Sequence, residues 1–225
     1  MVWGSDKTYI YAKHPDTYGK KEITSMWGFP YLYKNWNYTG YEGRSVEIMI
    51  FTNADEAELL INGRSAGRKA VSAERPMPCS VSFDIPYESG VIEAVSYKNG
   101  REVSRDSIKT AGAAAELKVS PEKPGLRADG HDLVCIGIEV LDKDGIPVPD
   151  AGIDLKAEVS GAGYLAGFGS ANPVTEEDYT DDTTVTYRGR AQAIIRSGYE
   201  SGKIMIKISA DGLPEVSTEI DVISQ

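Results

Sequence analysis

Two acidic stretches carry the residues of this chain whose types could do chemistry. The first, NADEAELLINGR (53–64), holds Asp55, Glu56 and Glu58 ahead of an Asn-Gly pair. Two carboxylates can serve as acid and nucleophile in glycoside hydrolysis, provided that an apolar cleft raises the pKa of the acid. Glu56 and Glu58 alternate with apolar residues instead, which predicts the solvated face of a strand. No other carboxylate has a cleft-like context, so we expect no catalytic residue in this chain.

The second acidic stretch, TEEDYTDD (175–182), gathers five carboxylates, which are Glu176, Glu177, Asp178, Asp181 and Asp182. Carboxylate oxygens are the ligands that calcium takes, so one interpretation is a cation loop. Their spacing is not that of an EF-hand, and we favour the alternative of a solvated loop. No His and Cys residues have the spacing of zinc ligands, so we expect neither a metal site nor a cofactor.

Aromatic residues gather in the first part of the chain, which holds all three tryptophans. The residues that could form a binding surface are Trp27, Phe29, Trp36, Tyr38 and Tyr41. Flat aromatic faces can stack on sugar rings, and they also anchor the seams between domains. We favour packing against a neighbouring domain and keep sugar stacking as the alternative.

The sequence GAGYLA (161–166) fits a relaxed dinucleotide-binding fingerprint. That motif needs a helix to begin within it, because the helix N-terminus meets the pyrophosphate. The next residues are GFGSANP, which favour turns, so we predict a glycine-rich turn and a short strand.

Charge and length limit the partners that this chain can have. Its 225 residues carry a formal charge of -10, which repels nucleic acid and anionic lipid. No apolar run approaches the ~20 residues of a membrane-spanning helix. Cys79 and Cys135 fall in separate strand-like runs, so we expect two thiols rather than a disulfide.

The elements that must position these residues are strands. Apolar and polar residues alternate with period two in SVEIMIF (45–51), CSVSFDIP (79–86) and DLVCIGIEVLD (132–142). Asn62-Gly63 and Asn99-Gly100 favour two-residue type I′ hairpin turns. We predict an all-β chain of two tandem immunoglobulin-like β-sandwich domains at 41–112 and 113–225. Residues 1–40 would form an extended, aromatic-rich lead-in that lies on the first domain or on a domain outside this chain.

Several of these segments resemble one enzyme family. The run WNYTGYEGRSVEIMIFTNADEAELLINGRSAGRK (36–69) resembles the domain that follows the catalytic barrel in many bacterial β-galactosidases of glycoside hydrolase family 2. HPDTYGKKEITSMWGFP (14–30) is similar to the connection that leaves the barrel. EVLDKDGIPVPDA, GSANP (169–173) and YRGRAQAIIRSG (187–198) resemble the terminal immunoglobulin-like domain of the same enzymes. GSANP departs from the more usual Gly-x-Gly-Asn/Asp-Pro at Ala171.

The resemblance implies a non-catalytic role. Members of the family hydrolyse β-galactosides with two glutamates on a (β/α)8 barrel, which needs ~250 residues and alternating strands and helices. No position of this chain matches either glutamate motif. The resemblance therefore implies that this chain is the C-terminal region of a bacterial enzyme. Its partner would be the catalytic barrel of the same parent chain. It would support the barrel, the cleft rim or a subunit interface, in a cytoplasmic, secreted or periplasmic protein.

Two other functions remain open on sequence grounds. A carbohydrate-binding module would use Trp27, Trp36 or Tyr38 as a stacking platform. A surface adhesin or stalk would carry further copies of the second domain in its parent gene, whereas the first hypothesis predicts an upstream barrel.

Overall fold

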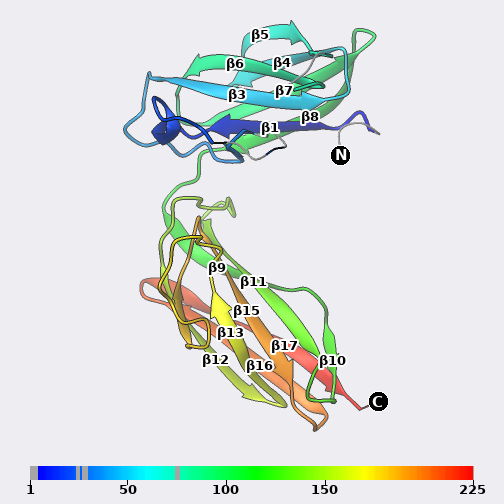
Figure 1. Ribbon diagram of the computed structural model, residues 1–225, viewed down its shortest axis with the longest axis vertical. Helices are drawn as coiled ribbons and strands as arrows, with labels where there is room; N and C mark the ends of the chain where they lie inside the picture. Colours follow the sequence, from blue (N-terminus) through cyan, green and yellow to red (C-terminus); the bar gives the residue numbers. More distant parts are fainter. Residues whose placement is uncertain (1–4, 24–25, 27–29, 74–76, 225) are drawn as a thin grey trace. The chain divides into compact units, whose positions relative to one another are not determined.

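The computed structural model describes residues 5–23, 26, 30–73 and 77–224. The chain divides into two compact units, Met1–Thr110 and Ala111–Gln225, and both are built from strands (Figure 1). Among the described residues the one helical element is a 3-10 turn at Pro15–Thr17. The prediction of an all-β fold with two tandem β-sandwiches is confirmed.

Unit 1 is a sandwich of two four-stranded antiparallel sheets. The first sheet has the order β2 (Leu32–Tyr33), β1 (Thr8–Lys13), β3 (Ser45–Thr52), β6 (Ser80–Pro86). The second sheet has the order β5 (Arg64–Ala70), β4 (Glu56–Ile61), β7 (Val91–Lys98), β8 (Arg101–Lys109). Residues buried between the two sheets form one hydrophobic core.

The two Asn-Gly pairs form the hairpin turns that the sequence predicts. Asn62 and Gly63 join β4 to β5 with φ values of 49° and 77°. Asn99 and Gly100 join β7 to β8 with φ values of 52° and 74°. Two consecutive positive φ angles define the type I′ turn, whose twist matches that of the strands that it joins.

Two described segments within the first forty residues are strands of unit 1. Strand β1 pairs with β3 over Thr8–Ala12, and Ile10 and Ala12 are fully buried in the core. The expected lead-in at 1–40 therefore supplies β1 and β2 to the sandwich. TYIYAK buries only alternate small and β-branched residues, and its other face carries two half-buried tyrosines and a lysine, so the alternation was not evident from the sequence.

Side chains of β8 close the corner where the two sheets of unit 1 meet. The amide of Ile10 donates to Asp106 Oδ2 at 3.0 Å, and the amide of Thr8 donates to Ser104 Oγ at 3.0 Å. Lys34 Nζ donates to the second oxygen of Asp106 at 2.8 Å. These bonds satisfy amides that lie beyond the two-residue pairing of β1 with β2, so the open edge of β1 is covered.

Unit 2 is a second sandwich, of one five-stranded and one four-stranded sheet. The larger sheet has the order β10 (Gly125–Arg127), β17 (Leu213–Ile223), β16 (Gly202–Ala210), β12 (Asp154–Gly161), β14 (Thr183–Val185). The smaller sheet has the order β13 (Gly163–Gly169), β15 (Arg190–Ser197), β11 (Leu133–Asp142), β9 (Ala114–Pro121). GAGYLA thus continues into strand β13 rather than a helix, as predicted.

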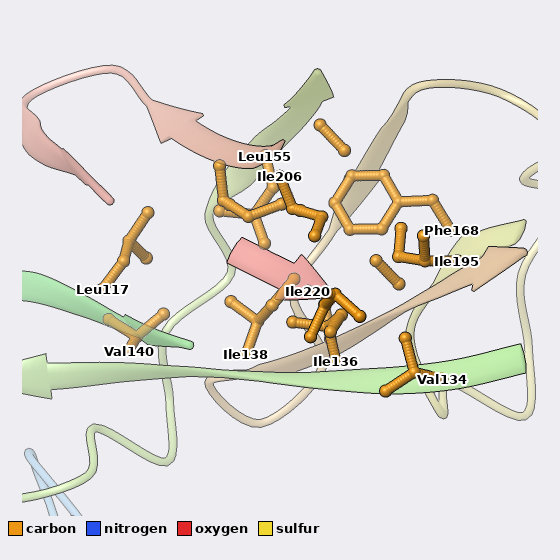
Figure 2. Close-up of a cluster of buried hydrophobic side chains, with 14 of the residues drawn as sticks. Leu117, Val134, Ile136, Ile138, Val140, Leu155, Phe168, Ile195, Ile206 and Ile220 are labelled. Carbon is orange, nitrogen blue, oxygen red and sulfur yellow. The ribbon is translucent and has the colours of Figure 1, made fainter. Parts of the chain in front are cut away.

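The core of unit 2 comes from the inward residues of both sheets. Val134, Ile136, Ile138 and Val140 alternate along β11 and face Ile206 and Ile220 of the other sheet (Figure 2). Phe168 is 1% exposed and belongs to the same core. The burial of these aliphatic side chains is the main term that stabilises the unit.

Candidate functional site

The aromatic segment of unit 1 holds most of the residues that the sequence singled out for binding. Trp36 has no exposed surface and Tyr38 is 2% exposed, so both belong to the hydrophobic core. A buried ring offers no face to a sugar. Trp36 and Tyr38 are therefore core residues rather than a stacking platform or a seam, because the segment that carries them enters the sandwich. Trp27 and Phe29 lie outside the described residues.

Trp36 is held by an aromatic cluster and by hydrogen bonds. Its ring meets Tyr87 edge to face at a centroid distance of 4.9 Å and Tyr38 at 5.8 Å. Its Nε1 donates to the carbonyl of Glu88 at 2.9 Å, and its own carbonyl accepts from Thr110 Oγ1 at 2.7 Å. Sequence reasoning missed Tyr87, which is 3% exposed and follows β6 directly, where its alternation with Ile85 is the available signal.

A shallow groove lies beside this cluster and contains the half-exposed Tyr41. The groove has a volume of about 360 Å³, and its lining includes Tyr18, Tyr41, Asp16 and Arg44. The Tyr41 hydroxyl donates to Asp16, which lowers the pKa of the carboxyl and raises that of the phenol. The Arg44 guanidinium lies 5.3 Å from the centre of the Tyr41 ring. The Tyr41 ring thus has the Asp16 carboxylate and the Arg44 guanidinium as neighbours.

Tyr18 has a structural role in the same groove. Its hydroxyl oxygen accepts a hydrogen bond from the amide of Glu47 at 2.6 Å. Burial raises the pKa of Tyr18, and the bond from Glu47 partly offsets this. The backbone pairing of β1 with β3 ends at Ile48. The Tyr18 hydroxyl therefore accepts from the next amide of β3, that of Glu47, which lies beyond this pairing.

The loop between Tyr18 and Tyr33 presents apolar side chains to solvent. Ile23 is 88% exposed and Met26 is 93% exposed, while Tyr31 is 49% exposed. The loop is tied to the unit by Glu22, which accepts from the amide of Tyr31 at 2.6 Å and pairs with Lys13 at 3.1 Å. Ile23 and Met26 are thus two large apolar side chains that have most of their surface in water.

The acidic residues of NADEAELLINGR lie on the surface, as predicted. Along β4 the side chains of Ala57, Leu59 and Ile61 are buried and the residues between them are half-buried. Glu58 accepts from Ser65 Oγ at 2.6 Å and from the Tyr97 hydroxyl at 2.9 Å, and both bonds lower its pKa. This carboxylate is therefore an ionised surface acceptor rather than a proton donor.

The loop 175–182 uses two of its carboxylates to hold its own backbone. Glu177 accepts from the amide of Val185 at 2.8 Å and from Thr184 Oγ1 at 3.2 Å. Asp178 accepts from the amide and the hydroxyl of Thr180, which lowers its pKa. These bonds fix the loop beside the short strand β14.

The other three carboxylates of this loop do not converge. Glu176 is exposed, Asp182 lies 3.9 Å from Lys156, and Asp181 lines an open hollow of about 560 Å³. Among the described residues no three His, Cys, Asp or Glu side chains are arranged to hold a metal ion.

Every carboxyl group of the described residues whose pKa is shifted has it lowered. These groups are Asp16, Glu22, Glu58, Glu88, Glu102, Asp129, Asp132 and Asp178. Hydrogen bonds to the ionised form are the first cause in each case. A general acid in glycoside hydrolysis needs the opposite shift, which burial in an apolar pocket produces.

Two family models match most of the chain between them. Residues 117–219 match "Glycoside hydrolase family 2 C-terminal domain 5". Residues 43–104 match a domain of unknown function, DUF4982. Each match falls within one of the two units.

Curated proteins with similar sequences include glycosidases. The chain is 31% identical over 191 residues to β-galactosidase BoGH2A of Bacteroides ovatus, covering 84% of this chain and 22% of that protein. It is 29% identical over 158 residues to a putative β-glucuronidase of Formosa agariphila, covering 69% of this chain and 15% of that protein. The chain thus spans about a fifth of the length of these relatives.

Solved structures agree with the sequence matches. A glycosyl hydrolase family 2 member from Bacteroides cellulosilyticus has a TM-score of 0.89 at 30% identity over 96% of this chain and 28% of that chain. A β-glycosidase from Bacteroides vulgatus has a TM-score of 0.79 at 27% identity over 98% and 25%. In the described part of the chain, no helix has the length and apolar character to cross a bilayer.

Proposed function

This chain belongs to glycoside hydrolase family 2, as part of the C-terminal region of that family's enzymes, and from this premise we propose that it is a non-catalytic support for the catalytic barrel of its parent chain. The parent would hydrolyse β-galactosides, with β-glucuronides as the other substrate class suggested by its relatives. Within such an enzyme the chain would stabilise the barrel, form part of the cleft rim or contribute to a subunit interface.

The loop that carries Ile23 and Met26 is the observation that supports this role most. Each side chain exposes more than four fifths of its surface, although the same segment buries Trp36 nearby. Covering two such side chains would contribute about 1.5–3 kcal/mol each. The loop belongs to the stretch that resembles the connection leaving the barrel, so the barrel is the neighbour that would cover it.

The carboxylates support the non-catalytic part of the proposal. Their shifted pKa values all move downward, and their hydrogen-bond donors are side chains and backbone amides of the surrounding turns and strands. A family 2 barrel needs roughly 250 residues, whereas this chain has 225 and builds two sandwiches from them.

The non-catalytic role can be tested on the chain alone. The purified chain is incubated with nitrophenyl β-galactoside and nitrophenyl β-glucuronide, and release of nitrophenol is followed. We expect no turnover above that of the buffer. Turnover that disappears when one of the chain's own carboxylates, such as Glu58 or Asp181, is replaced by its amide would refute the proposal.

A second candidate function is carbohydrate binding in the groove of Tyr18 and Tyr41. The half-exposed Tyr41 ring beside Asp16 and Arg44 combines a stacking face with groups that bind sugar hydroxyls. Titration with galactosides and plant polysaccharides, followed by calorimetry, tests this function. Saturable heat that is lost in Tyr41→Ala and kept in Tyr199→Ala would favour binding, since Tyr199 is an exposed tyrosine of unit 2. No heat in the wild-type chain would exclude it.

A further inference from the structure

The sequence contains the same tripeptide, Asn-Gly-Arg, in two hairpin turns, and the Asn side chains of the two copies make different contacts in the structure. The copies are 62–64 and 99–101, and Asn-Gly occurs nowhere else in the chain. Their backbones match, since the φ values of the Asn and Gly residues differ by only a few degrees between the turns. The tripeptide sequence and its φ angles are therefore held constant, while the surroundings of the two Asn side chains differ.

The side chain of Asn62 is locked on both of its polar atoms. Its Nδ2 donates to Glu88 Oε1 at 2.7 Å and to the carbonyl of Ser89 at 3.1 Å. Its Oδ1 accepts from the amide of Val91 at 2.8 Å. The amide group also packs against Gly90, where an added Cβ would lie 1.9 Å from Oδ1. Any rotation of this side chain breaks several contacts at once.

The side chain of Asn99 has none of these restraints. Asn99 and Gly100 are both exposed at the tip of the β7–β8 hairpin. The backbone amide of Asn99 donates to Asp55 Oδ2 at 2.7 Å, but its side-chain amide makes no hydrogen bond to any described residue. Its carboxamide is free to turn toward the chain that follows.

We propose that Asn99 is a site of spontaneous deamidation in the folded protein, and that Asn62 is protected from the same reaction. The backbone nitrogen of Gly100 attacks Cγ of Asn99, a new N–C bond forms, and the Cγ–Nδ2 bond breaks. Ammonia leaves with the proton from the Gly100 nitrogen, and a five-membered succinimide remains. Water then opens either of its two C–N bonds, which leaves aspartate or isoaspartate at position 99. The only co-reactant is water.

Glycine after asparagine favours this attack because it has no side chain to shield its nitrogen. The attack also needs Cγ to approach that nitrogen, so a side chain already bound elsewhere must first be released. Breaking the three hydrogen bonds of Asn62 adds to its barrier, and even a modest contribution from each makes its reaction at least ~10-fold slower.

The modification changes charge and turn geometry at one end of unit 1. It adds a carboxylate within reach of Asp55, which already accepts from the backbone at this position. An isoaspartate also lengthens the backbone of a two-residue turn whose strands pair from Lys98 and Arg101 onward. The modification would therefore alter the β7–β8 hairpin first.

The test is peptide mapping of the whole chain after incubation in mildly alkaline buffer. Peptides that contain 62–64 and 99–101 are compared over time for the mass gain of exchanging an amide NH2 for OH. The same incubation in denaturant gives the reference, because both tripeptides are then free. We expect similar rates in denaturant, and at least ~10-fold faster conversion at Asn99 than at Asn62 in the folded chain.

Variants identify the cause. Asn99→Gln should abolish the mass gain in its peptide, because glutamine would need a less favourable six-membered ring. Glu88→Ala removes one anchor of Asn62 and should raise conversion at Asn62 without changing that at Asn99. Comparable rates at the two sites in the folded chain, or no conversion at Asn99 while the denatured chain reacts, would overturn the proposal. An unchanged Asn62 rate in Glu88→Ala would overturn the reason given for its protection.

Discussion

Replacing Trp36 tests whether the aromatic segment is part of the core of unit 1. The side chain has no exposed surface and contacts Tyr38 and Tyr87 through ring edges. Trp36→Ala should therefore lower the free energy of unfolding of unit 1 by about 3–5 kcal/mol, the usual range for a buried aromatic residue. Trp36→Phe keeps a ring in place and removes the bond to the Glu88 carbonyl, so about 1–2 kcal/mol is expected.

The assay must report on unit 1 alone, because the chain has two units that can unfold separately. Hydrogen exchange followed by mass spectrometry of peptides from 45–61 measures the opening of β3 and β4 directly. Ile23→Ala is the matched control, since that side chain is 88% exposed and its loss should stay within about 0.5 kcal/mol. A loss below about 1 kcal/mol for Trp36→Ala would refute the assignment of Trp36 to the core.

Two further predictions concern carboxylates. Asp106→Ala should destabilise unit 1 by about 1–3 kcal/mol, because it removes the acceptor of the buried Ile10 amide and the partner of Lys34, as measured by denaturant unfolding. The Lys123 amine and nearby backbone amides lower the pKa of Asp132 to about 2. The stability that Asp132 contributes is therefore fully present above its unfolded pKa of about 3.9 and is lost as pH falls toward 2, so Asp132→Asn should flatten acid unfolding over this interval.

Both carboxylate predictions have matched controls. Asp84 is an exposed residue of β6, and Asp84→Ala should leave the stability of unit 1 within about 0.5 kcal/mol. In unit 2, Val174→Ala changes an exposed side chain that does not ionise, so it should leave the acid unfolding curve as it is in the wild-type chain. If Asp84→Ala were as destabilising as Asp106→Ala, or Asp132→Asn unfolded in acid like the wild type, the roles assigned to these bonds would be wrong.

Period-two patterning was enough to predict several of the strands. The strands β3, β4, β6 and β11 follow alternating residues whose apolar members are buried. Burial on one face of a sheet imposes this alternation, so the sequence carries it directly. The two Asn-Gly turns were equally evident, since few other residues accept two consecutive positive φ angles.

The aromatic segment could not be assigned from composition. A Trp or Tyr can be a stacking platform, a seam or a core residue, and these roles differ only in what surrounds the ring. For Trp36 the surroundings come from Tyr87 and Thr110, which are far from it in sequence. Strand β1 was missed for a related reason, because its partner β3 lies more than thirty residues away and its outward residues are aromatic.

The different fates of the two Asn-Gly-Arg turns were also invisible in the sequence. Asn62 is locked by Glu88, Ser89 and Val91, which the β6–β7 connection brings beside the turn. No described residue makes the corresponding hydrogen bonds to the side chain of Asn99. Contacts between turns depend on register, which the tripeptide itself does not encode.

The central claim, that unit 1 supports a catalytic barrel, is tested most directly in the parent enzyme. Ile23→Ser and Met26→Ser are introduced together, with Val174→Ser as the control, because Val174 is 85% exposed on unit 2. The measurement is the temperature at which glycosidase activity is lost irreversibly. We predict that the double variant lowers this temperature and the control leaves it unchanged. A double variant as heat-stable as the wild-type enzyme would contradict the claim.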